Sequence, residues 1–148
     1  MKKQFILFIA IIFTLAMVSS AYAAKAECPQ PRKTASAPSS DAKKDKTKKA
    51  NKAKGKKLYQ KTAKPLACMQ CHGKKGDGTG KLGAAFKSPK APRNFTCKET
   101  MKKVSSGQMF WIIKNGSKNQ PAMVSHKKTL KDKEIWDIVK YIREDLMK

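Results

Sequence analysis

The chain has 148 residues, with 34 lysines and arginines against 10 aspartates and glutamates, so its formal net charge is +24 at pH 7. This length allows one domain of ordinary size. A chain with so large a positive charge repels cations and is attracted to acidic surfaces.

The first 23 residues are typical of a secretory signal peptide. A short basic start precedes the apolar run 5–18, and Ala21-Tyr22-Ala23 places small residues at a cleavage site. The alternative is an uncleaved membrane anchor, but the run is shorter than the about 20 apolar residues of a spanning helix. We therefore expect cleavage after Ala23 and export to the periplasm, where nucleic acid is excluded as a partner.

Composition divides the rest of the chain into two parts. Residues 24–52 begin with prolines and serines and continue with lysines, and they lack the large apolar side chains that build a core. We expect this part to be a flexible extension and residues 53–148 to form the folded domain.

Two helices are predicted in the first and middle parts of that domain. Residues 51–63 fit a helix that turns Leu58 and Tyr59 inward and ends before Pro65. Residues 108–114 fit a short buried helix, because a glycine precedes them and Asn-Gly follows as a cap. Between the two helices the chain is rich in glycine, so neither a strand nor a long helix is expected there.

The last helix, over residues 131–148, has the clearest pattern. Its apolar residues recur at the spacing of one helical face, and its charged residues lie between them. The members of this apolar stripe are Ile135, Ile138, Val139, Ile142 and Leu146. No segment alternates as a strand does, so the expected fold class is all-α, with three to five helices and long loops.

The sequence Cys68-Met69-Gln70-Cys71-His72 is the attachment motif of c-type haem. Two thiols three positions apart on a helical turn can add to the two vinyl groups of one porphyrin, and the next imidazole can bind the iron. A thioredoxin-like pair would need a preceding strand, and a zinc site would need a fourth ligand. The motif therefore predicts one haem c, bound covalently through Cys68 and Cys71, with His72 on the iron.

Four residues are candidates for a second iron ligand. Met123 is the preferred one, because it follows Pro-Ala in a loop that can turn a thioether toward the haem. Met101 and Met109 border apolar helical segments, where methionine usually fills the core. His126 would give the iron two histidine ligands. A further alternative is an iron that has no second ligand from the protein.

These segments resemble the class I, mitochondrial-type small monohaem cytochromes c of bacteria, over about residues 55–143. The resemblance lies in Cys71-His72-Gly73 with the glycines of 76–80, in the proline-containing stretch 89–96, and in Pro121-Ala122-Met123. It implies that residues 53–148 are a cytochrome c domain, folded as helices and loops around one haem.

The resemblance also implies details of packing and of the haem pocket. The first and last helices should cross, with Gly55 and Tyr59 meeting Trp136 and Tyr141. A proline carbonyl, best matched by Pro92 and next by Pro89, should accept a hydrogen bond from the proximal imidazole. We expect apolar side chains such as Phe95, Phe110 and Trp111 to surround the haem, although ordinary core packing explains them equally well.

The function expected from these features is one-electron transfer by a periplasmic carrier that is not itself an enzyme. The alternatives are a haem c electron-entry subunit of a larger periplasmic oxidoreductase and a peroxidase-like catalyst. The lysines of 41–64, with Lys74, Lys75, Lys81 and Lys87, suit redox partner proteins with acidic docking surfaces or an anionic membrane surface. The oligomeric state is left open.

Two further cysteines, Cys28 and Cys97, depart from the family's pattern. They are the only pair left once haem has used the other two thiols, and an exported chain seldom keeps free thiols. We therefore predict a disulfide between them, with free thiols or cross-linked dimers as the alternative.

Overall fold

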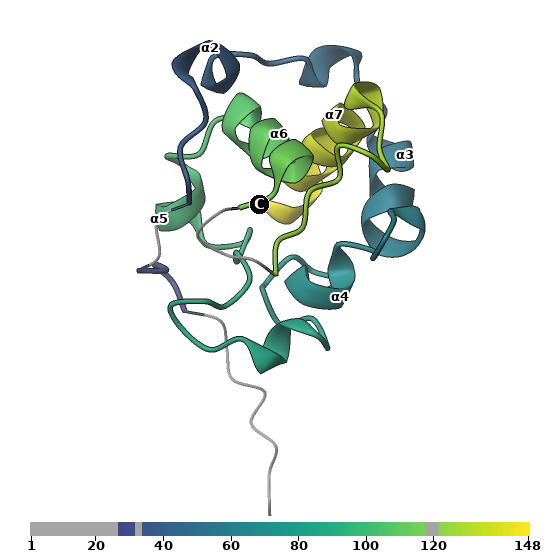
Figure 1. The fold of residues 1–148 in the computed structure, drawn as a ribbon. Helices are drawn as coiled ribbons and strands as arrows, with labels where there is room; N and C mark the ends of the chain where they lie inside the picture. Colours follow the sequence, from purple (N-terminus) through teal and green to yellow (C-terminus); the bar gives the residue numbers. More distant parts are fainter. Residues whose placement is uncertain (1–26, 32–33, 118–121) are drawn as a thin grey trace, which may run out of the picture.

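The computed structural model describes residues 27–31, 34–117 and 122–148, and over these ranges the chain is helical and contains no strand (Figure 1). The predicted signal peptide, residues 1–23, and Pro121 lie outside the described residues. No helix in the described ranges is long and apolar enough to span a membrane. The elements are α2 (Ser39–Ala42), η1 (Thr47–Lys49), α3 (Lys52–Lys57), η2 (Leu58–Thr62), α4 (Met69–His72), η3 (Gly83–Ala85), α5 (Lys98–Met101), α6 (Ser106–Asn115), α7 (Asp132–Tyr141) and η4 (Ile142–Leu146).

The first long helix consists of α3 and its continuation η2, a π-helical turn. Asn51 caps its start, because the Asn51 side chain accepts a hydrogen bond from the Lys54 amide at 2.9 Å. Leu58 and Tyr59 are buried as predicted. The helix ends at Thr62, since the residue before a proline disfavours helical geometry and Pro65 follows closely.

The last helix consists of α7 and η4, and its predicted apolar stripe is buried throughout. It crosses α3 at Gly55, where a Cβ atom would overlap the backbone carbonyl of Asp137. The rings of Tyr59 and Tyr141 meet with centroids 5.3 Å apart, as the family resemblance implies. Trp136, on the same helix, stacks on Phe110 of α6 with ring centroids 4.5 Å apart.

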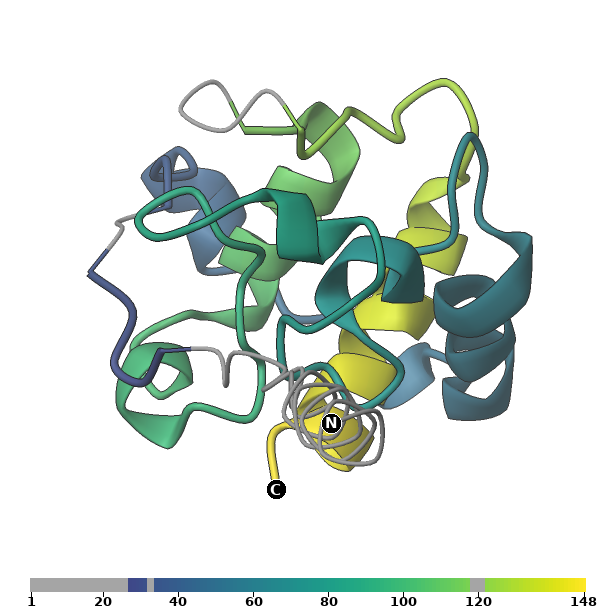
Figure 2. The same cartoon turned by 90° about the horizontal axis from the view of Figure 1, so that it is seen from below.

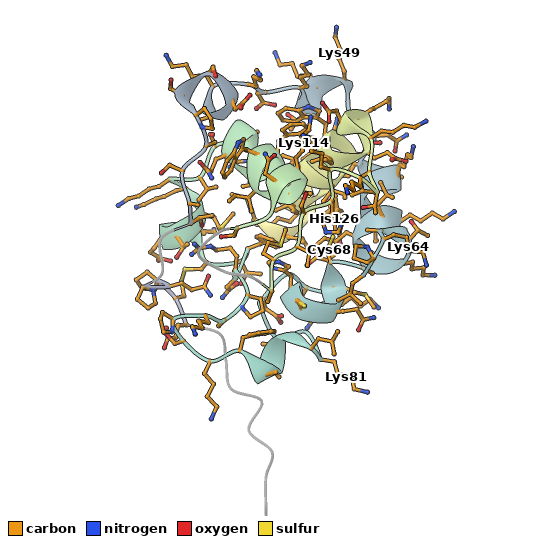
Figure 3. All side chains as sticks on the ribbon, in the orientation of Figure 1. Lys49, Lys64, Cys68, Lys81, Lys114 and His126 are labelled. Carbon is orange, nitrogen blue, oxygen red and sulfur yellow. A yellow bond between two sulfur atoms is a disulfide. The ribbon has the colours of Figure 1, made fainter. Side chains whose placement is uncertain are left out.

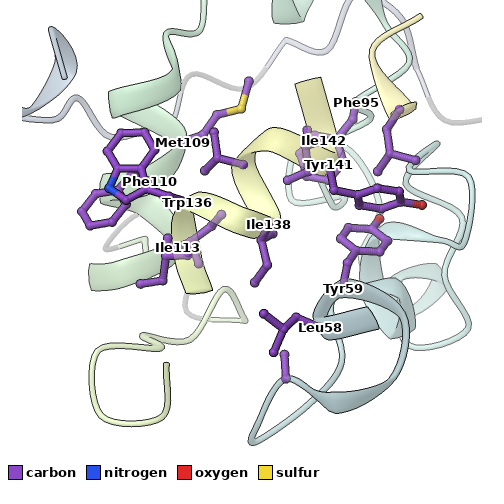
Figure 4. Close-up of a cluster of buried hydrophobic side chains, with 14 of the residues drawn as sticks. Leu58, Tyr59, Phe95, Met109, Phe110, Ile113, Trp136, Ile138, Tyr141 and Ile142 are labelled. Carbon is purple, nitrogen blue, oxygen red and sulfur yellow. The ribbon is translucent and has the colours of Figure 1, made fainter. Parts of the chain in front are cut away.

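Helix α6 packs against α7 and completes the core, as Figure 4 shows. The Ser105 side chain caps its start by accepting a hydrogen bond from the Gln108 amide at 3.1 Å. Gly116 ends it with φ +75°, a backbone conformation that favours glycine, as the Asn-Gly cap predicts. The other α-helices in the described ranges are single turns, so three longer helices carry the domain.

Residues 27–31 and 34–50, which belong to the segment expected to be a flexible extension, make contacts with the domain. The Ser105 hydroxyl donates to the Ala42 carbonyl at 2.6 Å, and Gly107 allows α6 to approach the carbonyl of Asp41. A disulfide joins Cys28 to Cys97, with Cα atoms 5.5 Å apart. None of the described residues of this segment is buried. Hydrogen bonds and the disulfide therefore attach it to the domain, and buried apolar side chains do not. Composition therefore gave no sign of this arrangement.

Candidate haem c site

A cleft lined mainly by apolar side chains lies beside the core. Its empty volume, which includes the solvent at its open mouth, is about 1150 Å³. Cys68, Cys71 and His72 of the attachment motif line it together. The loop before α7 supplies Met123 and His126. Figure 3 shows Cys68 and His126 in the middle of the molecule. The residues predicted from two separate motifs therefore face one space.

The attachment motif forms the single helical turn α4, which Gly73 ends with φ +79°. The glycine-rich segment after it folds back onto this turn. The Gly78 amide donates to the His72 carbonyl at 2.9 Å, and the Gly80 amide donates to the Cys71 carbonyl at 3.2 Å. A Cβ atom on Gly80 would lie 2.5 Å from a backbone oxygen of α4, so glycine is required for this close approach. The loop therefore holds the motif in place through backbone hydrogen bonds.

The imidazole of His72 has a fixed orientation. Its Nδ1 lies 3.0 Å from the Arg93 carbonyl oxygen, and its ring stacks on Phe95 with centroids 4.7 Å apart. A carbonyl oxygen can only accept a hydrogen bond, so Nδ1 carries the proton and Nε2 keeps the lone pair. His72 is thereby prepared to bind a metal through Nε2.

The expected acceptor for the His72 imidazole was the Pro92 carbonyl, and the structure places the Arg93 carbonyl there instead. The Pro92 carbonyl accepts a hydrogen bond from Gln30 Nε2 at 2.9 Å, and the carbonyl one residue later faces His72. Each of these two carbonyls therefore has its own partner. Pro92 nevertheless lines the cleft.

Tyr59 connects the first long helix to the attachment motif. Its hydroxyl donates to the Gly73 carbonyl at 2.8 Å inside the protein. Burial raises the pKa of Tyr59 well above its usual range, so the hydroxyl stays protonated and keeps this bond. The crossing of the first and last helices is thus tied directly to α4.

The thiols of Cys68 and Cys71 have the properties of side chains in an apolar wall. Burial raises the pKa of Cys68 to about 12. Burial also raises the pKa of Cys71 above its ordinary value. Both sulfurs are therefore protonated near neutral pH in the unligated chain.

All four candidates for the second iron ligand line the cleft, but their surroundings differ. Met101 and Met109 are 1% and 6% exposed and belong to the core cluster. Met123 is half-buried on a loop that two backbone hydrogen bonds hold in place. The Ser117 amide donates to the Met123 carbonyl at 3.1 Å, and the His126 amide donates to the Ile113 carbonyl at 3.1 Å.

His126 is 5% exposed, and its Nδ1 lies 2.8 Å from the Lys64 carbonyl oxygen. The same reasoning as for His72 places the Nδ1 proton in that bond. Among the aromatic residues expected around the haem, Phe95 lines the cleft. Phe110 packs on Trp136 in the core, and neither Phe110 nor Trp111 is among the residues that line the cleft.

A family model described as cytochrome c oxidase, cbb3-type, subunit III matches residues 50–142, which is more than half of the chain. The chain belongs to this family. It is a small cytochrome c of the class I type, and membership implies a covalently bound haem c and electron transfer. The comparisons with curated proteins and with solved structures found no match.

The residues of this cytochrome c fit the group that the family carries. Two thiols and an imidazole from the attachment motif line the cleft, and a thioether from a separate loop lines it as well. The remaining lining is mainly apolar, which suits the faces of a porphyrin. The cleft could therefore hold haem c through Cys68 and Cys71, with iron ligands from His72 and Met123.

Sequence reasoning missed three residues of this site. Arg93 had one available signal, its place directly after Pro92 in the stretch that resembles the family's proline segment. Thr34 lines the cleft, and Gln30 bonds to its wall, from a segment that composition assigned to a flexible extension. No motif marked either of them.

Proposed function

We propose that this cytochrome c is a periplasmic one-electron carrier, with one haem c bound through Cys68 and Cys71 and with His72 and Met123 as iron ligands. The observation that carries the proposal is the convergence of these four side chains on one apolar cleft. Haem c supplies an iron that gains or loses one electron. The protein orients His72, provides the thioether and excludes water from the cleft walls.

The proposal includes export, which rests on the sequence of residues 1–23. The basic start, the apolar run and the small residues before the cleavage position are those of a secretory signal. Attachment of haem to thiols outside the cytoplasm agrees with this route.

An open iron would favour a peroxidase-like catalyst, and carbon monoxide distinguishes it from a carrier. We expect the reduced protein to keep its absorption spectrum when carbon monoxide is added at neutral pH, because Met123 would bind the iron and leave no open site for the gas. Rapid and stoichiometric binding would contradict the carrier proposal. Met123→Ala provides the positive control, since this variant should bind carbon monoxide.

A second candidate is a haem c subunit of a larger oxidoreductase, which the description of the matching family favours. Isolation of the chain from its own cell under mild conditions separates the two candidates. A carrier elutes at the size of a small protein, whereas a subunit remains with a complex that has further redox centres.

We further propose that surface lysines direct this carrier to an acidic redox partner. Several lysines of the 41–64 run have intramolecular partners: Lys52 lies 3.3 Å from Asp145, and Lys54 lies 3.3 Å from Glu134. Lysines with no ion pair among the described residues occur at two separate places, near η1 and around the attachment loop. Figure 3 shows Lys49 and Lys81 at opposite ends of the molecule.

Two variants with the same change in charge test this proposal. One replaces four lysines near η1 by glutamate, and the other replaces four around the attachment loop; the positions are Lys43, Lys46, Lys48 and Lys49 in the first and Lys74, Lys75, Lys81 and Lys87 in the second. Exposed charges act over about 10 Å at 0.1 M salt, so both variants should slow electron transfer to an acidic acceptor at low salt.

We expect the larger loss, at least tenfold, in the attachment-loop variant, because its charges surround the motif that would hold the haem. The reduction potential should change little. Stopped-flow rates measured over a range of ionic strength provide the comparison. Equal rates for both variants and the parent at low salt would contradict a docking role for these lysines.

A further inference from the structure

The side chain of Gln30 binds the backbone on both sides of Arg93, the residue whose carbonyl accepts from His72. Gln30 Nε2 donates to the Pro92 carbonyl at 2.9 Å, and Gln30 Oε1 accepts from the Asn94 amide at 2.8 Å. The Arg93 guanidinium also donates to Oε1 at 3.3 Å. One carboxamide from the N-terminal segment thus fixes the peptide units that flank the acceptor.

Gln30 is itself held by contacts on both sides along the chain. The disulfide at Cys28 lies two residues before Gln30. The backbone amide of Gln30 donates to the Thr100 hydroxyl of α5 at 3.1 Å. Thr34 then accepts from the Arg93 guanidinium at 2.6 Å. The N-terminal segment therefore fastens the Pro92–Asn94 backbone from outside the region that the family model matches.

We propose that Gln30 is a positioning residue that sets the hydrogen bond from His72 Nδ1 to the Arg93 carbonyl. A hydrogen bond at the second nitrogen of a metal-binding imidazole fixes its orientation and raises its basicity. Gln30 thereby adjusts the reduction potential of the centre without touching the haem. This inference rests on the proposed function, because the potential is that of an iron bound by His72.

Loss of the Gln30 carboxamide frees the Arg93 peptide to move and weakens the bond to Nδ1. A less basic imidazole stabilises the oxidised iron less, so the potential should rise. We expect the Gln30→Ala holoprotein to show at least a threefold lower ratio of oxidised to reduced protein at a fixed ambient potential. A tenfold change in this ratio would correspond to 59 mV for one electron.

The direct readout is the His72 Nδ1 proton in the reduced, ¹⁵N-labelled holoprotein. We expect this proton to exchange with solvent at least tenfold faster in Gln30→Ala than in the parent. The matched control is Ser88→Ala, which removes the 2.8 Å bond from Ser88 to Glu27 in the same N-terminal segment but leaves residues 92–94 untouched. Its exchange rate and potential should equal those of the parent.

Gln30→Glu serves as the conservative variant if Gln30→Ala folds poorly. Glutamate keeps an acceptor for the Asn94 amide but loses the donor to the Pro92 carbonyl, so we expect an exchange rate between those of parent and Gln30→Ala. Exchange at the parental rate in both Gln30 variants, or equal acceleration in Ser88→Ala, would overturn the inference alone. A parent chain without covalent haem would overturn the proposed function as well.

Discussion

Replacing Cys68 and Cys71 together by alanine should give a chain that retains no haem under denaturing conditions and is largely unfolded. The cleft borders the core cluster, and Met101, Met109 and Ile138 belong to both. Without a covalently held group, these apolar walls face water, and a domain of this size has little stability to lose, about 5–15 kcal/mol in total. Haem staining after denaturing electrophoresis and circular dichroism measure the two effects.

The matched control replaces the other two cysteines, Cys28 and Cys97, by serine. This variant loses the disulfide, which should cost about 2–5 kcal/mol, but it keeps the attachment motif and should retain its haem. If the variant without Cys68 and Cys71 stays as folded and as stable as the control, the haem does not organise this domain.

Replacing Met123 by alanine should abolish the absorption band that arises from sulfur on oxidised iron, and it should lower the reduction potential. Methionine opposite histidine raises the potential, so its loss acts in the opposite direction. Met109→Ala is the control: Met109 also lines the cleft, but it is a core side chain. Its loss should cost about 2–5 kcal/mol of stability and leave the band intact.

The absorption spectrum of the oxidised protein checks this prediction directly. A band that survives in Met123→Ala would exclude Met123 as the ligand. A parent protein without the band would instead direct attention to His126, a histidine on the same loop that also lines the cleft.

The helices and the attachment motif could be predicted because their signals are local. The spacing of Ile135, Ile138 and Val139 specifies one buried face, and the Asn-Gly pair specifies the end of α6. The motif places two thiols and an imidazole on one turn by covalent connection alone. Such features depend on neighbours along the chain, so the sequence reveals them without knowledge of the tertiary fold.

The acceptor for His72 and the course of the N-terminal segment could not be predicted in this way. The choice between the Pro92 and Arg93 carbonyls depends on how a non-helical segment turns, and Gln30 fixes that turn from more than sixty positions away. The N-terminal segment buries no side chain among its described residues, so its composition resembles that of a disordered tether. Its attachment relies on single hydrogen bonds and one disulfide, which leave no periodic pattern.

Mass spectrometry of the protein matured in a host that attaches haem to cytochromes c tests the central claim most directly. Trypsin should release residues 62–74 as one peptide, because cleavage follows Lys61 and Lys74 while Pro65 protects Lys64. We predict that this peptide carries the mass of one haem, joined by thioether bonds to both Cys68 and Cys71, after complete denaturation. A peptide 62–74 with both thiols free and open to alkylation would contradict the account.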